Sequence, residues 1–152
     1  MDEKLFRKAM SKFATGITVV TIDDEDEVQG MTVNAFMSIS LNPKLIAVSI
    51  GDQASLYEKI LEKKQFGLNI LSDQQKDLSL IFSRQKEKDK PIPFAHLDGN
   101  PIIKGSLASL SCYVKDMKKA GDHMILIAEV RDIHLNNGNP LLYFNSNYNS
   151  LS

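Results

Sequence analysis

The sequence contains no tryptophan and only one cysteine among its 152 residues. A single cysteine excludes an internal disulfide framework, and no Cys/His cluster is present that would suit zinc. No apolar run approaches the roughly 20 residues of a transmembrane helix. The opening MDEKLFRKAMSKF lacks the apolar segment of a signal peptide. We therefore expect a cytoplasmic protein that has no contact with membranes and holds no metal.

An excess of charge of either sign is also missing. The 18 basic and 19 acidic residues leave a net charge of −1, which predicts no general attraction to nucleic acid or to anionic membranes. The chain is 43% apolar and 24% charged, as in ordinary globular proteins. Its length predicts a single domain over residues 1–152.

Motifs that carry covalent or metal chemistry are absent as well. The glycines form neither a G-x-G-x-x-G nor a G-x-x-x-x-G-K pattern, and H-E-x-x-H and G-x-S-x-G do not occur. Cys112 alternates with apolar residues on one face of an expected strand, which favours a small buried hydrophobe over a nucleophile. If the protein is an enzyme, we expect an organic cofactor to carry the difficult step.

Strand patterns dominate what is present. Apolar periodicity predicts helices over the first dozen residues, over 55–64 with Ser55 as N-cap, and over 73–83. Strands are expected at 17–22, 28–41 (one or two strands), 44–50, 65–71, 105–117, 122–135 and 141–144. A charged loop over 84–94 and a fraying polar tail after 144 complete the chain. This order has no βαβ alternation, so we expect a mainly β fold, an antiparallel barrel or sheet with flanking helices.

The stretch GMTVNAFMSISLNP (residues 30–43) has an unusual alternation. One face is apolar throughout, and the other carries neutral hydrogen-bonding groups around Phe36. The second face suits either a solvated sheet surface or a pocket for a planar heterocycle such as an isoalloxazine ring. The absence of any charged residue on it favours the pocket. The residues of this face are Thr32, Asn34, Phe36, Ser38 and Ser40.

A phosphate group would also need a site, and the turn GDQAS before the second predicted helix offers one. Backbone N–H groups at a helix start bind anions, with Ser55 among them. Lys59, one turn along that helix, or Arg84 at the start of the charged loop would offset the phosphate charge. The alternative is that Ser55 only caps its helix.

Six motifs in order resemble the short-chain flavin reductases: FATGITVVT, GMTVNAFMSISLNPKLIAVSI, FGLNIL, LASLSCYV, AGDHMILIAEV and PLLYF. The resemblance covers residues 13–148. It implies an FMN-binding split β-barrel, a homodimer, and an NAD(P)H:flavin oxidoreductase that binds FMN or FAD and takes a hydride from NADH or NADPH. It also implies a monooxygenase as a possible recipient of the reduced flavin.

The same resemblance implies a set of site residues. His123, in GDH, matches the family's histidine near the nicotinamide. Position by position, the two segments that match the family's flavin-binding segments are Thr32, Val33, Asn34, Ala35, Phe36 and Ser38, then Ser49, Ile50, Ala54 and Ser55.

Two rival functions stay open at this point. The tail NSNYNSL differs from the basic end that the family often has, so a dimeric FMN-binding electron carrier that ignores free NAD(P)H is the main alternative. A pyridoxine phosphate oxidase is ranked last, because no basic cluster suits a second phosphate.

Overall fold

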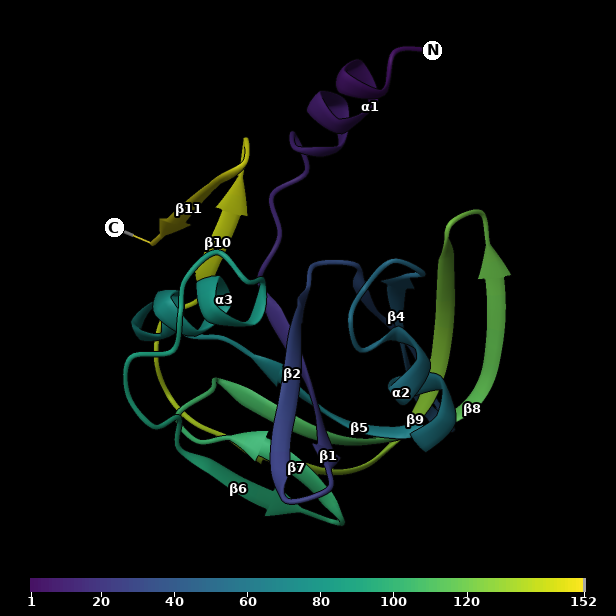
Figure 1. The fold of residues 1–152 in the computed structure, drawn as a ribbon, viewed down its shortest axis with the longest axis vertical. Helices are drawn as coiled ribbons and strands as arrows, with labels where there is room; N and C mark the ends of the chain where they lie inside the picture. Colours follow the sequence, from purple (N-terminus) through teal and green to yellow (C-terminus); the bar gives the residue numbers. More distant parts are fainter. Residues whose placement is uncertain (152) are drawn as a thin grey trace.

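The computed structural model describes residues 1–151, and Figure 1 shows their arrangement. The helices are α1 (Glu3–Met10), α2 (Tyr57–Lys63), the short 3-10 helix η1 (Asp73–Gln75) and α3 (Lys76–Phe82). The strands are β1 (Thr18–Asp24), β2 (Glu27–Val33), β3 (Phe36–Leu41), β4 (Lys44–Gly51), β5 (Gln65–Ile70), β6 (Phe94–Leu97), β7 (Asn100–Ile103), β8 (Ala108–Ala120), β9 (His123–Leu135), β10 (Leu141–Phe144) and β11 (Asn147–Ser150).

Seven strands form one sheet in the order β2-β1-β5-β8-β9-β4-β3, and every neighbouring pair is antiparallel. The prediction of a mainly β, antiparallel fold with a few helices is confirmed. The two edge strands, β2 and β3, are joined by only two residues, Asn34 and Ala35. A flat sheet of this width would hold its edges roughly 29 Å apart, whereas three Cα–Cα steps reach at most about 11 Å. The sheet must therefore curl until its edges meet at this link, although no ladder between β2 and β3 closes it among residues 1–151.

The concave side of the curled sheet holds the main core. Alternate residues of β4 and its neighbours point inward, and Val48, Leu126 and Phe66 have no exposed surface. Cys112 lies opposite Phe66 in the ladder between β5 and β8 and is fully buried. Burial raises the pKa of its thiol to about 12, so the side chain is protonated at neutral pH. This confirms the interpretation of Cys112 as a buried hydrophobe.

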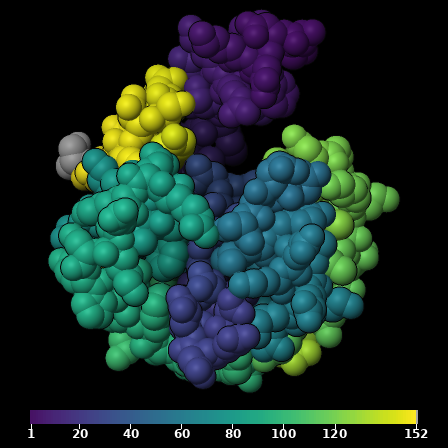
Figure 2. Space-filling model, viewed as in Figure 1, coloured from purple at the N-terminus to yellow at the C-terminus, as the bar shows by residue number. Residues whose placement is uncertain are grey.

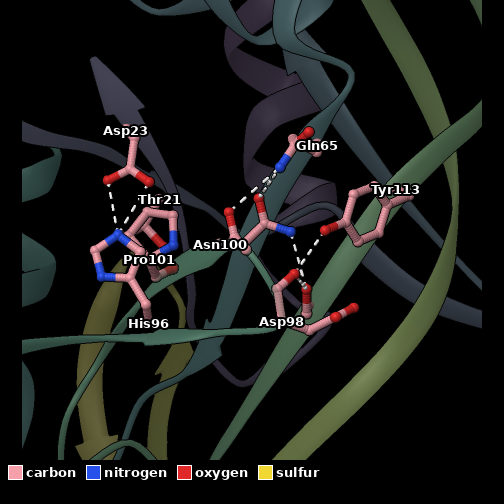
Figure 3. Close-up of polar contacts among 10 residues, drawn as sticks. Thr21, Asp23, Gln65, His96, Asp98, Asn100, Pro101 and Tyr113 are labelled. Atoms are coloured by element: carbon pink, nitrogen blue, oxygen red, sulfur yellow. Dashed lines mark hydrogen bonds and ion pairs between the residues drawn. The ribbon is translucent and has the colours of Figure 1, made fainter. Parts of the chain in front are cut away.

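The hairpin β6–β7 lies outside the seven-stranded sheet and covers the convex side of β1, β5 and β8. The sequence patterns did not predict it. Figure 3 shows its polar anchors. The Thr21 hydroxyl donates to the Pro101 carbonyl at 2.6 Å, and Asn100 donates to Ser111 at 2.9 Å. The Tyr113 hydroxyl donates to the Asp98 carbonyl at 2.6 Å. Neutral side chains that face outward from the sheet thus hold a covering layer.

Two local predictions were wrong. The second helix begins at Tyr57 with Leu56 at its N-cap position, and no side chain caps it, so Ser55 makes neither an N-cap nor a capping box. The polar tail was expected to fray, but its residues Asn147–Ser150 form β11 and pair with β10 in a C-terminal hairpin.

Helix α1 forms as predicted but stands away from the sheet (Figure 1). Asp2 caps it by accepting from the Lys4 amide at 3.0 Å. None of its residues is buried, and the apolar side of the helix, which includes Phe6 and Met10, is more than half exposed. No helix in the described part of the chain is long and apolar enough to cross a bilayer.

Candidate functional site

A cavity of about 400 Å³ lies against the link between β2 and β3. Its walls come from four segments: the chain after α1, the link with the start of β3, part of β4, and part of β9. The volume falls within the range of small-molecule sites. Its lining residues are Phe13, Thr15, Asn34, Ala35, Phe36, Met37, Ala47, Val48, Ser49 and Ile125.

The chemistry of this lining fits a flat, uncharged ring system. Seven of the ten residues are apolar and none is charged, and Thr15, Asn34 and Ser49 supply neutral donors and acceptors. Asn34 and Ala35 are exposed, and the Asn34 side-chain amide has no hydrogen-bond partner within residues 1–151. An isoalloxazine ring needs apolar cover together with a few hydrogen-bonding partners, and this cavity provides both.

His123 lies on the same face of the sheet as the cavity. Residues paired in an antiparallel ladder point to one face, and β4 pairs Ser49 with Ile125 and Gly51 with His123. His123 therefore follows Ile125 on that face at a distance of roughly 7 Å along β9. A Cβ atom on Gly51 would lie 3.5 Å from Nε2 of His123, so the missing side chain at Gly51 keeps this face open beside the imidazole.

The alternation of apolar and polar residues over 32–41 does not belong to one continuous strand. The link at Asn34 and Ala35 interrupts it, and the bulge between Ser38 and Ser40 shifts the register again. The apolar face of this stretch is not buried in β3, because Met37 is 60% and Leu41 is 80% exposed. Phe36 instead packs against the core.

Ser55 and Arg84 come together although 29 positions separate them. The Arg84 guanidinium donates to the Ser55 hydroxyl at 2.8 Å, where the turn before α2 meets the segment that follows α3. Lys59 lies elsewhere, with its ammonium group 2.5 Å from the Asp24 carboxylate. Of the two predicted cations, only Arg84 is thus beside Ser55.

The remaining predicted residues have other surroundings. Val33 and Ile50 are in the core and are 5% and 1% exposed, so their side chains are closed to a ligand. The Thr32 hydroxyl donates to the Ser79 carbonyl of α3 at 2.8 Å. Ala54 packs against the core, and Ser38 is exposed on β3.

The charged groups near His123 are arranged in pairs. Nδ1 of His123 lies 2.9 Å from Oδ1 of Asp122, and this hydrogen bond lowers the pKa of the Asp122 carboxyl. Lys119 donates to Asp52 at 2.9 Å, which lowers the pKa of Asp52 and raises the pKa of Lys119. Asp52, close in sequence to Ser55, is therefore matched by a cation and leaves no unpaired negative charge there.

Six of the lining residues were not assigned to the site from the sequence. For three of these six, the strand period or a motif of the sequence indicated a place near the site. Ile125 follows His123 by two positions, the period of a strand face. Phe13 and Thr15 lie in the FATGITVVT motif, although nothing in the motif places them over β4. The others are Met37, Ala47 and Val48.

Comparisons with known proteins agree with these observations. An NADH-dependent flavin reductase of a Rhodococcus species is 38% identical over 148 residues, covering 95% of this chain and 84% of that protein. The reductase subunit HsaB of a flavin-dependent monooxygenase from Mycobacterium tuberculosis is 32% identical over 160 residues, covering 99% and 83%. The structure of flavin reductase PheA2 in its native state superposes with a TM-score of 0.96 at 51% identity, covering 100% and 99% of the two chains.

Residues 10–152 match the family described as flavin reductase like domain. This match confirms the resemblance carried by the six motifs and, with it, the prediction of a flavin-reducing oxidoreductase. The chain belongs to the flavin reductase-like family.

Proposed function

We propose that this protein binds FMN, with FAD as an alternative, and reduces it with NADH. The observation that supports this most is the uncharged cavity at the β2–β3 link, which four predicted residues line together: Asn34, Ala35, Phe36 and Ser49. When bound, the flavin would accept a hydride from a dihydronicotinamide. NADH rather than NADPH is proposed because the Rhodococcus relative is named for it.

The chain's own residues would bind, orient and shield the reacting rings. Apolar side chains such as Phe13 and Ile125 would exclude water from one region of the cavity, and Asn34 and Ser49 would hydrogen-bond the polar end of the ring. The backbone around Ala54, together with Ser55 and Arg84, would hold the phosphate by charge-assisted hydrogen bonds.

His123 would act on the nicotinamide side as a positioning group. Its Nδ1 atom is engaged by Asp122 at 2.9 Å, which leaves Nε2 to face the space above Gly51. A ring nitrogen there can orient a carboxamide by a hydrogen bond. Hydride transfer itself requires no acid or base from the protein, so His123 would act by geometry.

An assay of nicotinamide oxidation tests the activity. Purified protein mixed with FMN and NADH should oxidise NADH rapidly, and NADPH more slowly. A protein that binds flavin but oxidises neither nucleotide would be the electron carrier instead, and the proposal of a reductase would fail.

Replacing Asn34 with alanine should weaken FMN binding about two- to tenfold, because one or two neutral hydrogen bonds to the ring are lost. Flavin fluorescence titration measures the change. Asn137→Ala removes another exposed amide, from the loop before β10, and should leave the affinity unchanged. Equal affinities for both variants and the parent protein would contradict this placement of the ring.

We also propose that the curled sheet is the split β-barrel of flavin-binding proteins, that residues 1–152 form one domain, and that two copies form a homodimer. Edge strand β3 exposes Met37, Ile39 and Leu41, and Phe13 beside it is 79% exposed. Apolar side chains gathered on an edge strand indicate a surface that is covered by another chain. The cavity opens beside this surface, because Phe13 and Met37 line it.

Replacing Leu41 with glutamate should separate the dimer. Leu41 is 80% exposed, so a charge there costs little within one chain but would be buried without a partner at an interface. Sedimentation should show twice the mass of one chain for the parent protein and a single chain for the variant. Leu151→Glu, at an equally apolar position that is 60% exposed at the C-terminal end, is the control and should stay dimeric. A parent protein that sediments as one chain would refute the dimer.

The recipient of the reduced flavin is proposed to be a cytoplasmic monooxygenase, because the relative HsaB is named as the reductase subunit of one. An uncharged cavity wall and an exposed Asn34 suit a flavin that arrives and leaves, since neutral hydrogen bonds hold the ring itself only weakly.

A further inference from the structure

Two walls of the cavity are connected to one element, the C-terminal hairpin β10–β11. Figure 2 shows this hairpin, in yellow, against the N-terminal segment, in purple. The Thr15 amide donates to the Tyr143 carbonyl at 3.0 Å, and the Tyr143 amide donates back to the Thr15 carbonyl at 2.9 Å. Thr15 lines the cavity, so the first wall is fixed to β10 by its backbone.

The second wall is fixed to β11 through one buried serine. The Tyr148 hydroxyl lies 2.7 Å from Oγ of Ser79, and Ser79 has no exposed surface. The carbonyl of the same Ser79 accepts from the Thr32 hydroxyl at 2.8 Å. Thr32 is two residues before Asn34, which lines the cavity. A continuous path thus runs from Tyr148 through Ser79 to the β2–β3 link.

The ring of Tyr148 is itself well held. It meets the ring of Tyr143 edge-on at a centroid distance of 5.3 Å, and the Lys76 ammonium lies 5.5 Å from its centroid. Tyr143 has no hydrogen bond from its own hydroxyl among residues 1–151. The two tyrosines share their ring contact, whereas the Lys76 contact and the hydroxyl bond that leads toward the cavity belong to Tyr148 alone.

We propose that the β10–β11 hairpin sets the separation of the two cavity walls and that Tyr148 is a positioning residue for flavin binding, acting through Ser79 and Thr32. This inference rests on the proposed function only in naming flavin as the ligand. The hydroxyl of Tyr148 fixes Ser79, Ser79 fixes the end of β2, and Asn34 is thereby held at a constant distance from Thr15. Loss of that hydroxyl would leave the walls in place on average but less well ordered, and a rigid ring would bind less tightly.

The test compares Tyr148→Phe with Tyr143→Phe. We expect Tyr148→Phe to raise the dissociation constant for FMN about three- to tenfold with kcat within a factor of two, whereas Tyr143→Phe should change neither. In flavin-free protein, amide hydrogen exchange over residues 31–36 should accelerate in Tyr148→Phe alone. Equal effects of the two variants on flavin affinity, or no effect of either, would overturn the proposal.

A double variant separates positioning from stability. Tyr148→Phe leaves the Ser79 hydroxyl buried without a partner, which is destabilising in itself. Adding Ser79→Ala removes that unpaired group, so the double variant should recover stability to urea and still bind FMN as weakly as Tyr148→Phe. Recovery of flavin affinity together with stability would overturn the proposal. If the parent protein takes up no flavin, the proposed function fails, while the exchange rates of residues 31–36 still decide the role of Tyr148.

Discussion

Gly67→Ala should destabilise the folded protein by about 3–5 kcal/mol. A Cβ atom at Gly67 would lie 1.9 Å from the Pro101 carbonyl oxygen and 2.6 Å from the Thr21 hydroxyl oxygen. The oxygen of Pro101 is backbone and accepts a hydrogen bond from Thr21, so it cannot turn away as a flexible side chain would. The β6–β7 hairpin would have to lift from the sheet, breaking the contacts that Figure 3 shows. Equilibrium urea unfolding, followed by circular dichroism, measures the loss.

Gly16→Ala is the matched control for this experiment. No atom lies within 4 Å of a Cβ atom built at Gly16, and its stability should change by about 0.5 kcal/mol or less. If Gly67→Ala unfolds at the same urea concentration as Gly16→Ala, the β6–β7 hairpin does not pack on β5 as described.

Arg84→Met should weaken FMN binding about ten- to a hundredfold and leave riboflavin binding unchanged. Riboflavin lacks the phosphate, and a hydrogen bond to a charged group contributes about 1.5–3 kcal/mol. The guanidinium of Arg84 is already directed at Ser55, 2.8 Å from its hydroxyl, so both groups converge on one position. Methionine keeps most of the side-chain length and removes only the charge and the donors. Titrations of both flavins by fluorescence give the two affinities.

Lys88→Met removes one positive charge from the same exposed segment and should leave FMN affinity nearly unchanged. The affinity of the parent protein for FMN should fall with added salt, because salt screens an exposed charge, while the affinity of Arg84→Met should not. Equal losses of FMN and riboflavin binding in Arg84→Met would mean that the residue supports the fold rather than the phosphate.

Much of the sheet was predictable from local pattern. The strands β1, β4, β5, β8 and β9 are rich in β-branched and apolar residues, and period-2 alternation marks the buried face around Cys112. The curl of the sheet was not predictable in this way. It follows from which strands become edges, and only the pairing of residues far apart in the sequence decides that.

The missed elements are those whose own residues have weak strand signals. The segment NPII of β7 contains a proline, and NYNS of β11 is almost wholly Asn and Ser, which strands disfavour. Strand β7 nevertheless pairs with β6, and β11 pairs with β10, because buried contacts stabilise the two hairpins. Tyr148 gains the Ser79 bond and the Tyr143 ring. Tertiary contacts thus outweighed local propensity at both hairpins.

In the candidate site, too, local pattern predicted some features and contacts between distant residues decided the others. Asn34, Ala35, Phe36 and Ser49 were predicted and do line one cavity. Ser55 and Arg84 were predicted separately, and their contact spans 29 positions that no local pattern relates. Lys59 was the other cation offered for the phosphate, but Asp24 at the end of β1 holds its ammonium group. Sequence pattern therefore identified residues better than it identified their partners.

The central claim is that the flavin ring occupies the cavity at the β2–β3 link. Backbone amide NMR of ¹⁵N-labelled protein titrated with FMN tests this claim most directly. Our account predicts the largest shift changes at residues 34–37, at Ser49 and at Ile125, which line the cavity on three segments. Changes confined to other surfaces, or no saturable change at all, would contradict it.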